Sequence, residues 1–172
     1  MTKQSNAARS SPFRKMADPA TSKVIARLAQ ADDLAAVLCL YKELRPADPE
    51  LSAERAAALW REVTDGRRSV VVVVEVGGSV VATCMLALIA NLASDGRQIG
   101  LIEHVITAEA FRQRGLAKRA LAFALEWAWD VPCCKVLLLS GTQRHEAHRL
   151  YQAVGFCGDV EKGFVIKAPL ST

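Results

Sequence analysis

Five consecutive valines at positions 70–74 constrain the fold more than any other feature of the sequence. They lie within the apolar stretch 69–76, and an unbroken run of β-branched residues is typical of a strand that is buried on both faces. A second apolar stretch covers residues 79–90, directly after the pair Gly77-Gly78. Because Gly-Gly between two strand-like runs favours a tight hairpin, these stretches predict the centre of a β-sheet.

The remaining apolar periodicity predicts an α/β domain with a mixed sheet. Further strands are expected near residues 24–28, 101–107, 135–139 and 163–167, and helices near 30–44, 52–64, 116–128 and 146–153. The resulting order, β-α-α-β-β-β-α-β-α-β, is typical of an α/β sandwich. The first helix is predicted to bury one stripe of side chains, formed by Leu34, Val37, Leu38, Tyr41 and Leu44.

Length and composition indicate one globular domain preceded by a tail. The chain has 172 residues, of which 51% are hydrophobic and 23% charged, so it can bury a core of ordinary size. Residues 1–22 are rich in Ser, Ala, Lys and Arg and are expected to be a disordered tail, which leaves residues 23–172 as a single domain. Residues 1–22 contain no apolar run long enough for a secretory signal, no run in the chain is long enough for a membrane span, and a cytoplasmic location is expected.

The net charge of +4 gives little support for a nucleic-acid partner. Residues 1–22 contain four basic residues and one acid, so the expected domain is nearly neutral. The cysteines show neither a disulfide framework nor a C-x-x-C pattern, and they are Cys39, Cys84, Cys133, Cys134 and Cys157. We therefore expect small core residues in a reducing compartment rather than disulfides or a zinc site.

A cluster of basic residues marks the start of the helix expected near 116–128. It consists of Arg112, Arg114, Lys118 and Arg119. The helix dipole already makes this end positive, so each cation there is unfavourable by about 0.3–1 kcal/mol unless an anion binds. Gly115 and Ala117 would let such an anion approach the free backbone amides of the first turn closely. The pattern predicts a binding site for a phosphate or diphosphate group.

Two motifs in this part of the chain resemble signatures of the GNAT acetyltransferase superfamily. The first is Arg112-Gln113-Arg114-Gly115-Leu116-Ala117, which is similar to the coenzyme A pyrophosphate loop Q/R-x-x-G-x-G/A. It departs from many members at Gln113, where they have glycine. The second is the segment 147–156, which fills every fixed position of the pattern A-x-x-L/F-Y-x-x-x-G-F/Y. With the strands before them, the resemblance spans nearly the whole predicted domain.

The resemblance implies the GNAT acyl-CoA N-acyltransferase fold, an α/β fold with a mixed, mostly antiparallel central sheet flanked by helices. It also implies an enzyme that moves the acetyl group of acetyl-CoA to a primary amine of a small molecule, by direct attack in a ternary complex. The coenzyme would contact the strand before the loop and the loop itself, at Val105, Ile106, Thr107, Arg112, Gln113, Arg114, Gly115, Leu116, Ala117 and Lys118.

Acetyl transfer to an amine needs a base for the amine, a donor for the developing oxyanion and an acid for the departing thiolate. Glu103 is the candidate base, directly or through a water, although a strand glutamate can instead pair with an arginine. The resemblance assigns the oxyanion to the Val105 amide and the acid role to Tyr151, for which core packing is the alternative. Because strand side chains alternate, His104 is expected on the face opposite Glu103, so that only one of the two faces the acceptor.

Several alternatives stay open at this point. His145 and His148 are three residues apart on a helix and could converge on a metal, but no acid or cysteine is clearly paired with them, and no metal ligand is assigned. The run 144–149 weakly resembles aminoalkylphosphonate N-acetyltransferases, which would favour a small amine with an anionic group. A protein-lysine acetyltransferase and a non-catalytic acetyl-CoA sensor are the other functions considered. A homodimer would cover exposed sheet edges.

Overall fold

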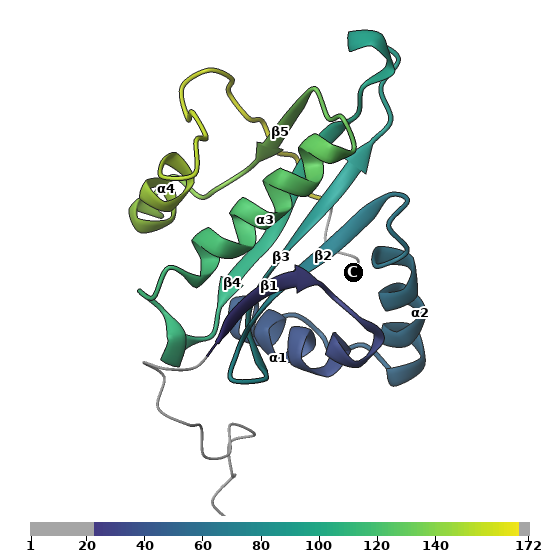
Figure 1. The fold of residues 1–172 in the computed structure, drawn as a ribbon, viewed down its shortest axis with the longest axis vertical. Helices are drawn as coiled ribbons and strands as arrows, with labels where there is room; N and C mark the ends of the chain where they lie inside the picture. The colour runs from purple at the N-terminus through teal and green to yellow at the C-terminus, as the bar shows by residue number, and fades with distance from the viewer. Residues whose placement is uncertain (1–22, 169–172) are drawn as a thin grey trace, which may run out of the picture.

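The computed structural model describes residues 23–168, which form a five-stranded sheet with helices on both faces (Figure 1). The strands are β1 (Val24–Leu28), β2 (Ser69–Val76), β3 (Ser79–Ile89), β4 (Ile99–Thr107) and β5 (Lys135–Leu138). They lie in sequence order across the sheet, with β1 to β4 antiparallel and β5 parallel to β4. The hairpin and the mixed, mostly antiparallel sheet predicted from the sequence are confirmed.

The helices lie close to their predicted positions. They are α1 (Leu34–Leu44), α2 (Ala53–Val63), α3 (Leu116–Asp130) and α4 (His145–Gln152), with short 3-10 turns at Ala31–Asp33, Ser94–Gly96 and Glu109–Phe111. In Figure 1, α3 lies across one face of the sheet, whereas α1 and α2 lie against the other face. The short helix α4 contacts α3 on the β5 side of the molecule.

The valine run of β2 contributes to two cores, one on each face of the sheet. Val72 and Val74 are fully buried and pack with residues of α3. Val71 and Val73 point to the opposite face and pack with Trp60 of α2. This alternation follows from the two-residue period of a strand. The sheet is therefore covered on both faces, as the valine run predicts.

The buried stripe of α1 differs from the prediction at one position. Leu38, predicted to face inward, is 37% exposed, whereas Leu40 is 2% exposed. An α-helix turns about 100° per residue, so Leu38 lies about 100° from Val37, while Leu40 lies about 60° from it in the other direction. The sheet covers the arc that contains Val37 and Leu40, and Leu38 falls outside that arc.

The strand predicted near residues 163–167 is not formed. This segment has no regular structure, and Phe164 and Ile166 are 85% and 97% exposed. The residues just before this segment do contact β5, through an ion pair from Lys135 Nζ to Glu161 Oε1 at 2.8 Å. An apolar run becomes a strand only where a neighbouring strand supplies backbone hydrogen bonds, and residues 23–168 supply none here.

Other sequence predictions have mixed outcomes. The predicted tail, residues 1–22, lies outside the described residues. Between residues 23 and 168, no helix combines the length and the apolar character needed to cross a membrane. The cytoplasmic location stays a prediction.

Cys84 and Cys133 are buried as expected, but Cys39 and Cys157 are exposed, so the prediction of core cysteines is wrong for these two.

Candidate active site

The strands β4 and β5 separate where the candidate catalytic residues begin. Their parallel pairing covers Ile99–Ile102 of β4 and Lys135–Leu138 of β5. Beyond it β4 continues to Thr107, whereas β5 has ended, and no other strand of the described region pairs with this edge of β4. Residues 103–107 therefore have a backbone edge without a strand partner, where an extended ligand can bind.

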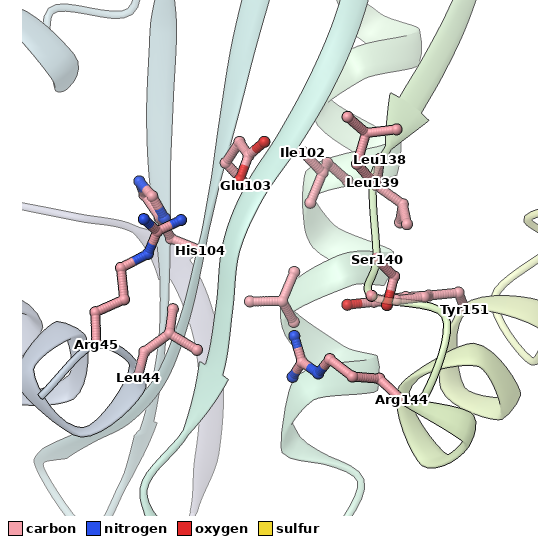
Figure 2. A pocket seen from close by; sticks show the side chains of 12 residues that line it. Leu44, Arg45, Ile102, Glu103, His104, Leu138, Leu139, Ser140, Arg144 and Tyr151 are labelled. Carbon is pink, nitrogen blue, oxygen red and sulfur yellow. The ribbon is translucent and has the colours of Figure 1, made fainter. Parts of the chain in front are cut away.

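A β-bulge in β4 reorients the side chains beside this edge. In the ladder with β3, His104 and Val105 together lie opposite the single residue Cys84. His104 has a φ of +55°, in the left-handed region, and the extra residue interrupts the alternation of the strand. As a result, both Glu103 and His104 line one cavity (Figure 2). The prediction that Glu103 and His104 lie on opposite faces is wrong for this reason.

A cavity of about 270 Å³ lies between β4 and the end of β5. Its lining comes from the end of α1, from the bulge, from the segment after β5 and from α4, and consists of Leu44, Arg45, Ile102, Glu103, His104, Val105, Leu138, Leu139, Ser140, Gly141, Arg144 and Tyr151. Figure 2 shows Glu103 and Tyr151 on opposite sides of β4. The structure thus brings the two candidate catalytic residues, which are distant in sequence, to a single cavity.

Tyr151 is held in a largely apolar environment at one wall of the cavity. It is 7% exposed, and its ring packs edge-on against Phe156 with the centroids 6.3 Å apart. Burial raises the pKa of the Tyr151 phenol, which outweighs the lowering by Arg144. Ser140 lies beside it in Figure 2, and the Ser140 Oγ is buried without a hydrogen-bond partner in the described region. The phenol is protonated at neutral pH, as a general acid must be.

His104 is a neutral imidazole at the wall formed by α1. Burial lowers the pKa of His104, and among the nearby charges Glu103 raises it, Arg45 lowers it and Asp48 raises it, so the net direction is downward. Its ring lies 4.9 Å from that of Tyr41, centroid to centroid. The bulge residue therefore adds a hydrogen-bonding group to the cavity without adding a charge at pH 7.

Two arginines of the cavity have little sequence signal: Arg45 has none, and Arg144 has only the weak resemblance of the run 144–149. Arg45 follows the last residue of α1, immediately before Pro46, and Arg144 directly precedes α4. Arginines at helix ends are common, so neither position indicates a site on its own. Both become candidates only because the fold places the end of α1 and the start of α4 on either side of β4 (Figure 2).

The predicted coenzyme loop follows the C-terminal end of β4, outside this cavity. Gln113 and Gly115 both have left-handed φ angles, +61° and +71°. Such residues turn successive backbone N–H groups toward one side, which is the geometry of anion-binding concavities. Leu116 then opens α3, and its side chain is buried in the core. The loop at the start of α3 thus has two left-handed residues, and the anion site predicted from the basic cluster stays a prediction.

Two arginines of this loop form side-chain hydrogen bonds with backbone carbonyls next to it or within it. Arg112 Nε donates to the Thr107 carbonyl at 3.3 Å. A guanidinium nitrogen of Arg114 donates to the Ala110 carbonyl at 3.1 Å, and its central carbon lies 5.0 Å from the centre of the Phe111 ring. These contacts fix the path from β4 into α3. The guanidiniums therefore stabilise the conformation of the loop between β4 and α3.

The open edge of β4 and this loop fit coenzyme A. The Thr107 Oγ1 is buried and has no hydrogen-bond partner in the described part of the chain. A Cβ placed on Gly115 would meet no atom within 4 Å, so the space above the loop is open. The side chains of Ile106 and Leu116 belong to the core, so only their backbone groups are available. A diphosphate at the loop and an amide-containing arm along β4 would satisfy these groups.

The sequence profile of the acetyltransferase (GNAT) family matches residues 34–156. The chain belongs to the GNAT acetyltransferase family. The solved structure of a provisionally assigned acetyltransferase from Agrobacterium tumefaciens strain C58 is 34% identical to this chain, with a TM-score of 0.78 over 84% of this chain and 99% of its own. An acetyltransferase from Trypanosoma brucei is 24% identical, with a TM-score of 0.73 over 85% of this chain and 100% of its own. No functionally curated protein matches this chain significantly in sequence.

A third GNAT neighbour is an aminoglycoside N-acetyltransferase in complex with the bisubstrate analog CoA-S-monomethyl-acetylneamine. It is 19% identical, with a TM-score of 0.72 over 86% of this chain and 100% of its own, which shows a shared fold. The predicted GNAT fold is thus confirmed. Family membership makes this protein an acetyltransferase with acetyl-CoA as its acetyl donor. The weaker resemblance to aminoalkylphosphonate N-acetyltransferases stays a prediction.

Within the described part of the chain, the two histidines of α4 do not belong to a metal-binding cluster. The rings of His145 and His148 are 6.1 Å apart, centroid to centroid. His148 Nε2 lies 3.0 Å from the Gly141 carbonyl oxygen, to which its N–H donates. Across residues 23–168, no group of three or more His, Cys, Asp or Glu side chains is arranged to hold a metal ion. His148 instead ties α4 to the segment after β5.

Proposed function

We propose that this GNAT protein transfers the acetyl group of acetyl-CoA to a primary amine of a small molecule, by direct attack in a ternary complex. The observation that carries this proposal is the single cavity lined by Glu103, Val105 and Tyr151. These residues supply the base, the oxyanion donor and the acid that the reaction needs. A volume of about 270 Å³ is suited to a small acceptor rather than to a long segment of another protein.

Each residue has one role in the transfer. The bound thioester supplies an activated carbonyl carbon. Glu103 accepts a proton from the attacking amine, directly or through a water, as the C–N bond forms. The Val105 N–H donates to the carbonyl oxygen as it gains negative charge. Tyr151 donates its phenol proton to the sulfur as the C–S bond breaks, and regains a proton from solvent. An ammonium substrate thus yields an amide and a free thiol, with the net release of one proton.

Coenzyme binding is assigned to the elements next to this cavity. Val105, Ile106 and Thr107 would hold the pantetheine arm through the open edge of β4. The loop from Arg112 to Lys118, with Gln113, Arg114, Gly115, Leu116 and Ala117 between them, would hold the diphosphate. The unpartnered Thr107 hydroxyl and the two left-handed residues of the loop support this assignment.

Thiol release from acetyl-CoA, measured against a panel of acceptors, tests the proposal. The panel contains amino acids, aminoalkylphosphonates, polyamines and lysine peptides, each with and without a divalent metal. Turnover on small amines is the expected result. Turnover on peptides alone would identify a protein-lysine acetyltransferase instead. Tight binding of acetyl-CoA without turnover on any amine would identify a non-catalytic sensor.

We also propose that the domain forms a homodimer through its C-terminal region. Four apolar side chains after α4 are at least 70% exposed, namely Val160, Phe164, Val165 and Ile166. They follow β5, which is the last strand of the sheet formed by residues 23–168 and has one edge without a strand partner there. Pairing with a second copy would bury both features. Light scattering should show a dimer, and the double substitution Phe164→Asp with Ile166→Asp should give a monomer. A wild-type monomer at high concentration would contradict the dimer.

A further inference from the structure

The cavity of this enzyme has an excess of positive charge. Two guanidiniums line it, Arg45 and Arg144, against a single carboxylate, Glu103. His104 adds no charge at neutral pH, because burial lowers its pKa. A primary amine is protonated at pH 7, so the acceptor has a net positive charge unless it also contains an anionic group. The lining therefore favours acceptors that also carry a negative charge.

Neither cavity arginine has its charge satisfied by another residue of the described region. Arg45 and Arg144 form no ion pair and no side-chain hydrogen bond with any residue between 23 and 168. Arg27 provides a contrast, because it pairs with Asp33 at 2.6 Å and with Glu75 at 2.7 Å. The guanidinium of Arg27 is thus neutralised by carboxylates, whereas the two in the cavity are available to a ligand.

The two arginines lie on different sides of β4. Figure 2 shows Arg45 with His104 on the side from which Glu103 projects, and Arg144 with Ser140 on the side of β5. The β5 side is where the open edge of β4 would hold the coenzyme. An acceptor whose amine lies at Glu103 would therefore extend toward Arg45 rather than toward Arg144.

The position of Arg45 is fixed by contacts between α1 and β4. Its backbone N–H donates to the Tyr41 carbonyl at 2.8 Å. The ring of Tyr41 in turn packs against His104 in the bulge, next to Glu103. The end of α1 is thus held beside the candidate base, although the Arg45 side chain itself is solvent accessible. A guanidinium carried by an anchored backbone can reach an anionic group beside the amine and pair with it.

We propose that the acceptor is a primary amine with an anionic group, a carboxylate or a phosphonate or phosphate, and that Arg45 binds this group while Glu103 faces the amine. The inference rests on the proposed function of the same cavity. Guanidinium pairs with carboxylates and phosphoryl groups through two parallel hydrogen bonds, which adds specificity as well as affinity. Polycationic amines are disfavoured, because their additional ammonium groups would meet Arg45 or Arg144.

Acceptors that differ only in their terminal group test this inference. The assay compares kcat/KM for primary amines of equal chain length that end in a carboxylate, a phosphonate, a hydroxyl or a second ammonium, over several chain lengths. We expect kcat/KM for the amines that end in a carboxylate or phosphonate to exceed kcat/KM for those that end in a hydroxyl by about 10- to 100-fold. This is the range of one charge-assisted pair. The carboxylate and phosphonate series distinguish the two sources of the anion.

Substitution of Arg45 assigns the selectivity to one residue. Arg45→Gln should lower kcat/KM for the anionic amines by about 10- to 100-fold and leave the hydroxyl series nearly unchanged. Arg45→Lys should restore part of the preference. The control is Arg55→Gln, which removes the same charge from an exposed position of α2 outside the cavity and should change neither series.

The outcomes separate this inference from the proposed function. Equal turnover of anionic, neutral and cationic amines would overturn the inference and leave the acetyltransferase function in place. A preference for anionic amines that Arg45→Gln leaves intact but Arg144→Gln removes would overturn the assignment to Arg45. Absence of turnover on every amine would overturn the proposed function itself.

Discussion

The rings of Tyr41 and His104 lie with their centroids 4.9 Å apart and their planes tilted by 58°, which joins α1 to the bulge of β4. One residue of this pair lies on a helix and the other at a left-handed position of a strand. Through this contact α1 packs against His104, which lines the cavity. The neutral state of His104 is part of this packing, because a charged imidazole would be buried at a cost.

Stability is expected to depend on pH through His104. Its pKa is lowered by folding, so between the folded and unfolded pKa values the unfolded chain binds more protons. The contribution of neutral His104 to the free energy of unfolding is fully present above the unfolded pKa of about 6.5. It is lost as the pH falls through the folded pKa. Urea unfolding should show a free energy of unfolding that decreases below about pH 6.5, and His104→Asn should remove this part of the decrease.

Asparagine is the appropriate replacement because it tolerates a positive φ better than most residues. The matched control is His145→Asn, at an exposed position of α4, which should keep the wild-type pH profile. If His104→Asn also keeps that profile, the half-buried, neutral imidazole of His104 is not the source of the pH dependence.

Glu103→Gln tests the base. Loss of a general base typically lowers the rate by about 10²- to 10⁴-fold, and this is the expected fall in kcat at pH 7. The defect should shrink as the pH approaches the pKa of the amine, about 10.4 for an alkylamine such as a lysine side chain, because the amine then arrives deprotonated. Steady-state kinetics from pH 7 to 10 measure this. A defect of constant size over that range would indicate that Glu103 positions the substrate instead.

Tyr151→Phe tests the acid and separates an enzyme from a sensor. The ring and its packing on Phe156 are kept, so the fold should be unaffected. We expect kcat to fall by about 10²- to 10⁴-fold while the Kd for acetyl-CoA stays within a few-fold of wild type. Single-turnover kinetics and isothermal titration calorimetry measure the two quantities. Unchanged turnover would mean that the Tyr151 hydroxyl has only a packing role.

Gly115→Ala tests the loop at the start of α3. Gly115 has a φ of +71°, where an L-residue costs about 1–2 kcal/mol, and its open surroundings mean that no steric clash adds to this cost. The free energy of unfolding should fall by that amount, and the Kd for acetyl-CoA should rise because the new methyl group lies near the loop amides.

The control for this substitution is Gly158→Ala, a position that is also open but has no positive φ. It should change neither stability nor coenzyme affinity appreciably. Equal effects at positions 115 and 158 would show that the conformation of the loop glycine is not responsible.

Local pattern was sufficient for the elements that depend on neighbours in sequence. The valine run, the Gly-Gly turn and the spacing of apolar residues in α3 each reflect the period of a strand or a helix. Local sequence was also sufficient for the two motifs that contain Gly115 and Tyr151, because their residue types and spacing resemble the GNAT signatures. The predicted strand at 163–167 failed because a strand also needs a partner, which local pattern does not provide.

The sequence by itself therefore determined the family, most of the fold and the identities of Glu103 and Tyr151 as candidates. Only the tertiary structure decided that His104 shares the cavity with Glu103, because the bulge depends on how β4 pairs with β3. Likewise, Arg45 acquires significance only when α1 packs against β4 and leaves its guanidinium without a carboxylate partner in the described residues. Such contacts join residues far apart in the chain, and their physical basis is packing and pairing between elements rather than the propensity of any one of them.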